Sequence, residues 1–443
     1  MSPAPTARRG GRRPGATSGP LAGPRAALGR AGTALAQWLR RPLTSLHLIL
    51  GVFGLLTLFG LVMVLSASSV EAFAAGGSSY SVFARQLMFC GAGLVLFWIG
   101  LRTPPKVVRA LAPAFLIVCA VLLALVLIPG IGSVRGGSRG WFTVGSFGFQ
   151  PGEPARVALA MWGAHVLAAR RAVMHRWKHA LSPVVPVAMV LATLIVLEPD
   201  LGMTVSLGIV LIALLFFAGA PMRLLAALSG GALAGALILG LTAGYRQSRI
   251  TAFLSPDADP LGPAYQATQA LYSLADGGLF GVGLGQGRAK WSYLPNAHND
   301  FIFAIIGEEL GFVGAFAVLA LFATLAYTGL RIAARNTDPW LRILCATLTV
   351  WLVAQAAINI GYVVGLLPVT GLQLPLISSG GSSLVVTMFA FGILANAARH
   401  EPEAVAALRS DGQGRVARLL GLRPPQPYQA PVPRPPAQRG AVR

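Results

Sequence analysis

Long apolar runs alternate with short polar or glycine-rich connections along most of this chain. A helix needs about 20 apolar residues to cross the hydrocarbon core of a membrane, and ten runs approach or reach that length. The pattern predicts an all-α polytopic membrane protein with about ten transmembrane helices and a large loop between the seventh and the eighth. The runs are Leu46–Ser66, Gln86–Leu101, Val108–Pro129, Pro154–Ala169, Val184–Leu197, Met203–Ala218, Met222–Tyr245, Phe301–Leu330, Leu341–Leu366 and Ser382–Ala398.

The least clear division lies between the fifth and sixth runs, where the chain reads Glu-Pro-Asp-Leu-Gly from Glu198 to Gly202. Proline interrupts the hydrogen bonding of a helix and glycine weakens it. Two separate membrane spans and one long bent helix both fit this pattern.

Composition supports the membrane assignment. Hydrophobic residues make up 55% of the chain and charged residues 11%, whereas soluble domains carry about 25% charged residues. The net charge of +21 would suggest a nucleic-acid partner in a soluble protein. Here the excess follows membrane topology, so no nucleic-acid partner is expected.

The distribution of basic residues predicts the orientation. Residues 1–45 hold eight arginines and no acid, which places this tail in the cytoplasm by the positive-inside rule. An even number of spans returns the C-terminal tail to the same side. We expect a disordered basic cytoplasmic tail at 1–45, a transmembrane catalytic domain at 46–399 and a Pro/Arg-rich cytoplasmic tail at 400–443. The tails suit anionic membrane lipid, and residues 415–423 suit a short interfacial helix.

Several kinds of chemistry lack a sequence signal. Cys90, Cys119 and Cys345 each lie inside an apolar run without CxxC spacing, so neither a disulfide framework nor a zinc site is indicated. The chain has no HExxH, GxSxG or Walker motif, which gives proteolysis, ester hydrolysis and ATP-driven pumping no support.

The first group of candidate residues lies at the end of the largest loop. Asp300 sits where this loop meets the eighth apolar run, and Glu308 and Glu309 lie two turns deeper. Ionisable residues at membrane depth are costly and therefore candidates for function. Asp300 or Asn299 could instead cap the helix, and one of the two glutamates is expected to face a polar interior, hydrogen-bonded or protonated.

The second group is Arg139-Gly-Trp141 followed by Gln150 to Arg156. Glu153 and Arg156 are three residues apart, so on a helix that begins near Pro154 they share a face and can pair. An interfacial salt bridge of little energetic value is one interpretation. An anion-binding cation oriented by its carboxylate is the other.

The third group is the Pro/Gly-rich stretch 366–383, at what should be membrane depth. Gly380-Gly381 lets backbone N–H groups turn toward a ligand, and the hydroxyls of Ser378, Ser379 and Ser382 add donors. The looser glycine spacing at 281–287 matches no phosphate-binding pattern and favours a flexible loop.

These residues together resemble the SEDS family (shape, elongation, division and sporulation) of bacterial peptidoglycan polymerases, over nearly the whole chain between the first and last spans. The run from Tyr293 to Gly311 is closer to the members that act in division than to those that act in elongation, and the Ala/Arg/Gly/Pro-rich tails suggest an actinobacterial chain. The segments that carry the resemblance are Gln150-Pro-Gly-Glu153, Pro199-Asp-Leu-Gly202, Tyr265-Gln266, Leu294-Pro-Asn-Ala-His-Asn-Asp-Phe301, Gly307-Glu-Glu-Leu-Gly311, Leu367-Pro-Val-Thr-Gly371 and Ile377-Ser-Ser-Gly-Gly-Ser382.

The resemblance implies a ten-helix inverting glycosyltransferase that polymerises lipid II outside the cytoplasmic membrane. Its catalytic aspartate falls on Asp300 as general base, and its paired glutamate and lysine fall on Glu153 and Arg156. Arginine cannot act as a proton donor, so Arg156 would not take over an acid–base duty of the family lysine. The expected substrate-binding residues are Arg139, Gln150, Tyr265, Gln266, Lys290, His298, Ser378, Ser379, Gly380, Gly381 and Ser382.

The resemblance also implies a cellular setting. We expect a multi-pass protein at the division septum, with lipid II, a class B penicillin-binding transpeptidase and other divisome proteins as partners. No cofactor is certain, and a divalent cation (Mg²⁺ or Mn²⁺) bound with the help of Asp300 stays open. The alternatives are a lipid II flippase, which would need polar groups through the midplane, and a non-enzymatic divisome scaffold.

Overall fold

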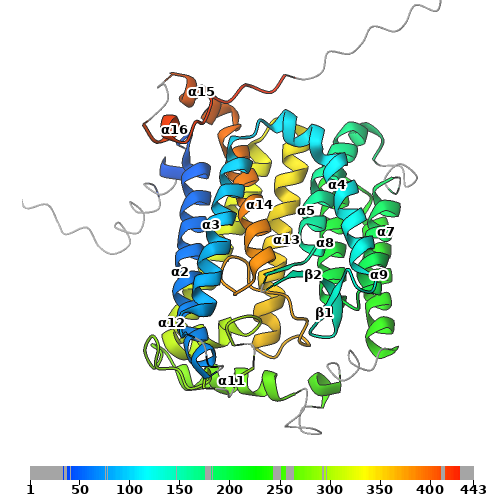
Figure 1. Cartoon of the computed structure of the whole chain (residues 1–443). Helices are drawn as coiled ribbons and strands as arrows, with labels where there is room; N and C mark the ends of the chain where they lie inside the picture. Colours follow the sequence, from blue (N-terminus) through cyan, green and yellow to red (C-terminus); the bar gives the residue numbers. More distant parts are fainter. Residues whose placement is uncertain are drawn as a thin grey trace, which may run out of the picture.

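The structure, a computed structural model, describes residues 33, 37–39, 41–74, 76, 78–145, 147–174, 181, 183–242, 251–255, 264–291, 294–295, 297–410 and 415–429. Ten long helices of this part form one bundle (Figure 1). They are α2 (Thr44–Ala74), α3 (Ser81–Arg102), α4 (Pro105–Val126), α5 (Gly152–Arg170), α7 (Val184–Leu197), α8 (Leu201–Phe217), α9 (Met222–Thr242), α12 (Ile302–Arg335), α13 (Pro339–Val363) and α14 (Gly381–Arg399).

Each of the ten apolar runs falls on one of these helices, which confirms the predicted all-α membrane fold. Seven helices of the described chain, namely α2, α3, α4, α9, α12, α13 and α14, are long and apolar enough to cross a membrane. Helices α7 and α8 are shorter apolar helices of 14 and 17 residues. Helix α5 has 19 residues and lies inside the bundle among the others.

The segment Glu198–Gly202 divides two helices, so the alternative of one long bent span is wrong. Helix α7 ends at Leu197, and α8 begins at Leu201 and packs beside it. The Asp200 carboxylate accepts a hydrogen bond of 2.9 Å from the Met203 N–H and so caps α8. The turn stays short because proline ends the first helix and the cap begins the second.

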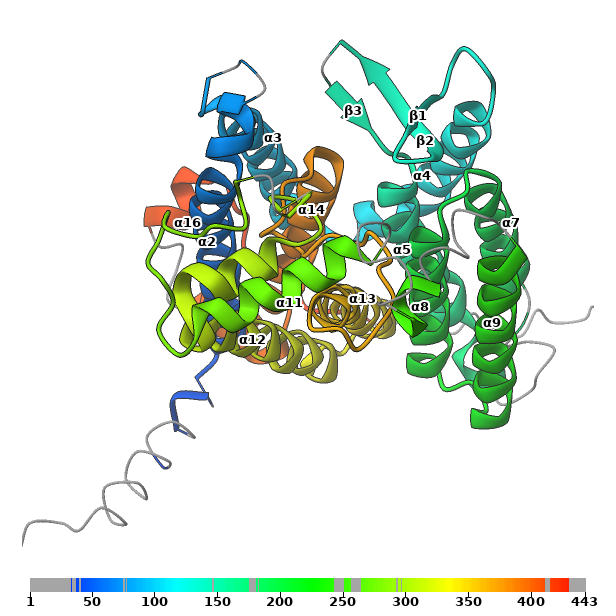
Figure 2. The same cartoon turned by 90° about the horizontal axis from the view of Figure 1, so that it is seen from below.

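One end of the bundle, which we call the site end, carries the elements that the apolar pattern did not reveal. A small antiparallel sheet in the order β1 (Ser133–Arg135), β2 (Ser138–Val144) and β3 (Phe147–Phe149) forms between α4 and α5. Helix α11 (Tyr265–Gly277) lies across α12 and α13 at the same end (Figure 2). The stretch 367–380 crosses the middle of this end without regular structure.

The opposite end, which we call the tail end, holds the start of α2 and the two short helices α15 (Pro402–Ser410) and α16 (Arg415–Leu419) (Figure 1). The described part of the C-terminal tail therefore has structure, and α16 lies within residues 415–423, where a short helix is expected. Trp98 Nε1 donates to Leu420 O at 2.9 Å, and Arg399 donates to Arg423 O at 2.8 Å. Most of residues 1–45, and residues 430–443, lie outside the described part. A 3-10 turn (Arg171–Val173) follows α5 at the tail end.

The centre of the bundle is formed by α5, α13 and α14, most of whose side chains are buried. Helix α14 packs closely along α3, and glycine makes this approach possible. A Cβ on Gly100 would lie 3.1 Å from Phe389 O, and a Cβ on Gly392 would overlap Phe97 O. Small residues at such crossings let helix backbones approach each other within a membrane.

Candidate active site

Helix α13 holds the loop that carries Asp300. The Asn359 amide donates to Asp300 O at 2.9 Å and to Leu372 O at 2.8 Å. The Tyr362 hydroxyl oxygen lies 2.9 and 2.8 Å from the same two carbonyl oxygens, and its single proton is donated to one of them. Both side chains are buried. Two residues of one helix therefore fix the Asp300 backbone against the stretch 367–380.

One turn earlier on α13, Gln355 connects the same region to Arg156. The Gln355 carbonyl oxygen accepts from Arg156 Nη1 at 2.9 Å, and its amide donates to Gln373 O at 2.9 Å. Positions four apart share a helix face and are separated by about 6 Å along the axis. The first and second groups of candidate residues thus meet on one face of α13.

Glu153 and Arg156 pair, as their spacing predicts. The pair is buried, so the interpretation as a solvated interfacial salt bridge is wrong: Arg156 is fully buried and Glu153 is 6% exposed. Arg156 Nη1 also donates to Ser206 Oγ at 2.7 Å, and its guanidinium carbon lies 4.9 Å from the centre of the Trp351 ring. The guanidinium links α5, α8 and α13, and all of these acceptors belong to the protein.

The third group touches the second through Ser382. The Ser382 hydroxyl accepts from the Gln150 N–H at 3.1 Å and donates to Gly148 O at 3.2 Å. The Gln150 amide in turn donates to Asp200 at 3.1 Å. The start of α14, the end of β3 and the α7–α8 turn are therefore joined by one chain of hydrogen bonds.

The third group also touches the first. Ser379 N donates to His298 O at 2.9 Å, and the Gln373 amide lies 3.5 Å from Asn299 Oδ1. Ser378 stabilises the backbone of this stretch, because its hydroxyl accepts a hydrogen bond from Leu374 N at 2.8 Å. The three groups of candidate residues, which are far apart in sequence, therefore lie close together at the site end.

Gly380 and Gly381 lie at the N-terminus of α14, at the point where the three groups come together. Gly380 occupies the N-cap position and no side chain caps the helix there. A Cβ on Gly380 would overlap the Gln373 amide, and one on Gly381 would lie 2.5 Å from the Phe89 ring. Glycine is needed for close approach at both positions. The free N–H groups and the helix dipole make this terminus favourable for an anion.

Asp300 does not occupy the capping position of α12. The N-cap residue is Phe301, and its side chain makes no capping hydrogen bond. Asn299 and Asp300 precede it and are half-buried. Both residues therefore lie just before the N-cap position, and the Asp300 backbone is fixed by α13.

The carboxylates deeper in α12 serve the protein interior. Glu309 accepts from Lys290 Nζ at 3.0 Å and from Ser66 Oγ at 2.6 Å. Glu308 accepts from the backbone N–H groups of Arg288 and Ala289. Lys290 is 5% exposed, and it also donates to Gly285 O at 2.6 Å. The Lys290 ammonium is thus held in a buried ion pair, and its expected role in substrate binding stays a prediction.

The glycine-rich stretch 277–287 is docked on α12, in contrast to the free loop that the sequence favours. Helix α12 is broken at Gly311, whose φ of +66° and ψ of −165° suit only glycine. Val282 N and Gly283 N donate to Glu308 O and Glu309 O at 3.0 Å, and Phe312 N donates to Gly278 O at 2.9 Å. The loop backbone replaces the hydrogen bonds that the break removes.

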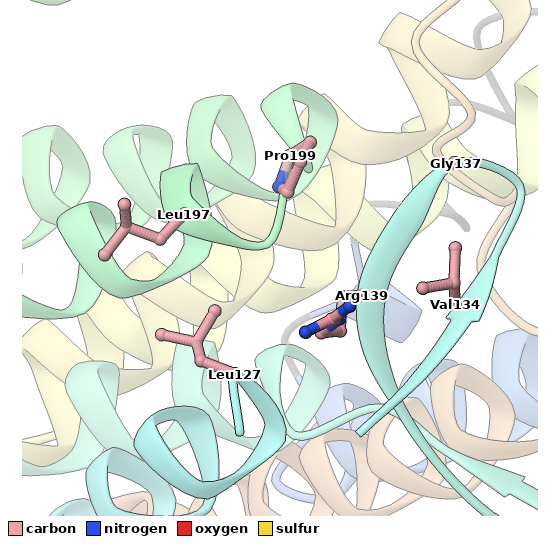
Figure 3. Close-up of a pocket in the computed structure, with 6 residues that line it drawn as sticks. All are labelled: Leu127, Val134, Gly137, Arg139, Leu197 and Pro199. Carbon is pink, nitrogen blue, oxygen red and sulfur yellow. The ribbon is translucent and has the colours of Figure 1, made fainter. Parts of the chain in front are cut away.

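The remaining predicted residues lie at the edges of the site end. Tyr265 and Gln266 form the first turn of α11 and are half-buried. Arg139 lies on β2 and lines a separate pocket between the sheet, α4 and the α7–α8 turn (Figure 3). Among the described residues, no three His, Cys, Asp or Glu side chains lie together as they would around a metal ion.

The residues that bring the three groups together are not among the sequence candidates. They lie inside apolar runs, where the hydrophobic pattern assigns them to membrane spans. A signal was available, because amides spaced four apart in a transmembrane helix are expensive unless they have partners. These connecting residues are Ser206, Trp351, Gln355, Asn359 and Tyr362.

Several known proteins resemble this chain. The family model of the cell cycle proteins FtsW, RodA and SpoVE matches residues 46–403. A probable peptidoglycan glycosyltransferase FtsW of Mycobacterium tuberculosis is 53% identical over 399 residues, which cover 90% of this chain and 76% of the relative. The stage V sporulation protein E of Bacillus subtilis is 40% identical over 359 residues, covering 81% of this chain and 98% of the relative.

Solved structures show the same likeness. The rod shape determining protein RodA of Thermus thermophilus has a TM-score of 0.60 at 27% identity, with 83% of this chain and 99% of that chain covered. A chain from a structure described as "Structural coordination of polymerization and crosslinking by a peptidoglycan synthase complex" has a TM-score of 0.61 at 28% identity, with coverages of 78% and 98%.

Proposed function

This chain belongs to the FtsW/RodA/SpoVE family of cell cycle proteins, and we propose that its chemistry takes place at the site end, where α13 binds the Asp300 backbone one turn away from its contact with Arg156. The chain is a peptidoglycan glycosyltransferase, a hexosyltransferase, as the names of its relatives indicate. In this proposal it polymerises lipid II with inversion at the anomeric carbon. Its residues divide into a base, an anion-binding helix terminus and a positioning pair.

One observation carries the assignment: Gln355 and Asn359 lie one turn apart on α13, one bound to Arg156 and the other to the Asp300 backbone. A polymerase that joins two lipid-linked sugars needs a base at the acceptor hydroxyl and positive potential at the donor pyrophosphate. The site end offers a half-buried carboxylate, Asp300, and an uncapped N-terminus of α14 within one connected network.

Asp300 is the general base in this proposal. The donor sugar is α-linked to a pyrophosphate and the product is β-linked, so a single in-line displacement gives the inversion. Asp300 takes the proton from the acceptor hydroxyl as that oxygen attacks the anomeric carbon. The N–H groups of Gly381 and Ser382 at the start of α14 face the charge that develops on the leaving pyrophosphate.

Glu153 and Arg156 are positioning residues in this proposal. Arg156 is fully buried and bound to Ser206, Gln355 and Glu153, and an arginine does not give up its proton near neutral pH. Its contacts hold α5 and α8 against the face of α13 that fixes the Asp300 loop. The pair supports the geometry of the site, and a phosphate would have to displace protein acceptors to reach the guanidinium.

We place the site end outside the cytoplasmic membrane and the tail end in the cytoplasm. The basic residues Arg102, Lys106, Arg331 and Arg335 flank helix ends at the tail end, in agreement with the positive-inside rule. Polyprenyl chains would stay in lipid beside the helices while sugar head groups reach the site end.

We further place the protein at the division septum, with a class B penicillin-binding transpeptidase as partner. A structural neighbour from a peptidoglycan synthase complex supports this part of the proposal.

The central test is the substitution Asp300→Asn. The variant should express, fold and bind lipid II, because it keeps the backbone carbonyl through which α13 holds this loop. Glycan synthesis from fluorescent lipid II should fall by about 10²- to 10⁴-fold, because an amide cannot act as a base. The assay is run with and without a transpeptidase partner. Asp276→Asn, which changes an exposed carboxylate on α11, is the matched control and should retain activity.

The same assay tests a divalent cation at Asp300. If Asp300 is a metal ligand, excess Mg²⁺ or Mn²⁺ should restore part of the activity of the Asn variant, and a chelator should inactivate the wild type. If Asp300 is only a base, added metal leaves the Asn variant inactive. Wild-type activity of Asp300→Asn under all conditions would remove this residue from the mechanism.

A further inference from the structure

A second pocket at the site end lies outside the network around Asp300. It has a volume of about 340 Å³ and lies between the C-terminal end of α4, the sheet and the α7–α8 turn (Figure 3). This volume is within the range of small-molecule sites. It is lined by Leu127, Val134, Gly137, Arg139, Leu197 and Pro199.

Arg139 provides the only charged side chain in this lining. Its side chain projects from β2 into the space beside Leu127 and Leu197 (Figure 3). The residue is half-buried, and its guanidinium makes no hydrogen bond, ion pair or ring contact with another described residue. A guanidinium is always charged and offers five donors, so Arg139 can donate to an anion that enters the pocket.

The geometry of β2 explains why the carboxylate of Glu198 does not pair with the Arg139 guanidinium. Arg139 N and the Ser138 hydroxyl donate to Glu198 O at 3.1 and 2.5 Å, which fixes β2 on the α7–α8 turn. The Glu198 carboxyl faces Gly140, where a Cβ would lie 2.7 Å from Oε2. Adjacent residues on a strand point to opposite faces. Glu198 and the Arg139 guanidinium therefore lie on opposite faces of β2, and the guanidinium stays available.

The rest of the lining selects an amphiphile. Leu197 is 60% exposed and Val134 is 58% exposed, and Leu127 directly follows α4. Leu127 and Leu197 lie at the ends of α4 and α7, where exposed aliphatic side chains face lipid. A ligand that fills this pocket thus has an anionic group for Arg139 and an apolar chain that continues along α4 and α7.

We propose that this pocket binds the phosphate group of a lipid, with Arg139 as its ligand and the apolar chain directed into the membrane. Two lipids carry that chemistry: the polyprenyl pyrophosphate of the substrate and product, a source that rests on the proposed function, and an anionic phospholipid of the bilayer. A planar guanidinium binds phosphate oxygens in pairs, which lysine does not.

The test measures lipid binding and needs no glycan synthesis, so its outcome is independent of the role of Asp300. The full chain in neutral detergent is titrated with undecaprenyl pyrophosphate and, separately, with phosphatidylglycerol, and bound lipid is counted by native mass spectrometry. Arg139→Gln should weaken binding of at least one lipid by about ten-fold to a hundred-fold, and Arg139→Lys should have a smaller effect. The lipid affected identifies the source.

Two further variants separate a specific effect of Arg139 from a general loss of positive charge and from a failure of Arg139→Gln to fold. Arg135→Gln removes the same charge from the same sheet outside the pocket, where Arg135 lies over the Trp141 ring, and should leave both affinities unchanged. Val134→Trp fills the pocket from an exposed position and should weaken binding even if Arg139→Gln fails to fold. Unchanged binding of both lipids in Arg139→Gln and Val134→Trp would overturn the proposal, as would an equal loss in Arg135→Gln.

Discussion

Single residues at the site end show how far a sequence can assign chemistry. The spacing of Glu153 and Arg156 predicted their pairing, and the structure confirms it. The same spacing could not show that Arg156 is fully buried, because burial depends on Ser206 and Gln355, which come from distant helices. The ion pair of Lys290 was hidden for a similar reason, since its partner Glu309 follows 19 residues later, beyond a loop.

We expect the Glu153–Arg156 pair to behave as a coupled unit. Arg156→Gln leaves a buried carboxylate without its cation, and Glu153→Gln leaves a buried guanidinium without its anion, each at a cost of about 3–5 kcal/mol. The double variant should cost clearly less than the sum of the two. Arg156→Lys should lie between wild type and Arg156→Gln, because it keeps the charge and loses donors to Ser206 and Gln355.

Chemical unfolding in detergent micelles measures this cycle. The polymerisation assay on the same proteins separates stability from activity, since a positioning role predicts that Arg156→Lys stays active. Strictly additive free energies of unfolding would contradict the buried pair and favour a solvated one.

Glu198 should make stability depend on pH. Burial away from water, and then the nearby Asp200 carboxylate, raise the pKa of Glu198 to about 8, from a usual value of about 4.3. Between these values the folded protein binds a proton that the unfolded chain has lost, so stability falls as the pH rises from about 4.3 through 8. Glu198→Gln should melt above the wild type at about pH 8.5 and close to it at about pH 5.

A thermal melt at several pH values in detergent checks this expectation. Glu403→Gln, the same change on the exposed side of α15, should keep the wild-type slope. If the Glu198→Gln variant shows the wild-type pH dependence, another group carries it.

At the scale of elements, the long apolar runs predicted the ten helices and placed most of their bounds within a few residues. Helix α7 even matches its predicted range, Val184–Leu197. The three-stranded sheet was missed because its strands have three to seven residues, too short for alternation to stand out. The break in α12 was missed because the loop that compensates it lies about 30 residues earlier in the chain.

Gly311→Ala should release the glycine-rich loop from α12. Its φ of +66° with ψ of −165° strains any L-residue, and an added Cβ would overlap Gly281 N and Leu279 O. We expect a loss of about 1–3 kcal/mol in stability and faster hydrogen exchange at Val282 and Gly283. Gly208→Ala, in α8 with nothing within 4 Å of an added Cβ, should be neutral or stabilising. Unchanged exchange in Gly311→Ala would mean that the loop docks without this break.

For the whole molecule, the sequence predicted which motifs matter but could not show that they meet. Residues near positions 150, 300 and 380 converge only because α13 and α14 pass through the middle of the bundle and contact α5. Contacts of this kind depend on how the helices pack, which a single sequence does not reveal. The even number of helices, in contrast, follows from counting apolar runs, and with it the return of both described chain ends to one side (Figure 1).

Orientation is the last property that follows from this architecture, and the chain is well suited to a direct test. Its three cysteines, Cys90, Cys119 and Cys345, are buried, so they should react slowly with a membrane-impermeant thiol reagent. Val144 on β2 is 78% exposed at the site end, and Leu419 on α16 is 88% exposed at the tail end. In intact cells whose outer layers admit the reagent, Val144→Cys should be labelled at once and Leu419→Cys only after lysis. The reverse pattern would place Asp300 in the cytoplasm, away from a polymer assembled outside the membrane, and labelling of both in intact cells would contradict a ten-span bundle whose two ends lie on opposite sides.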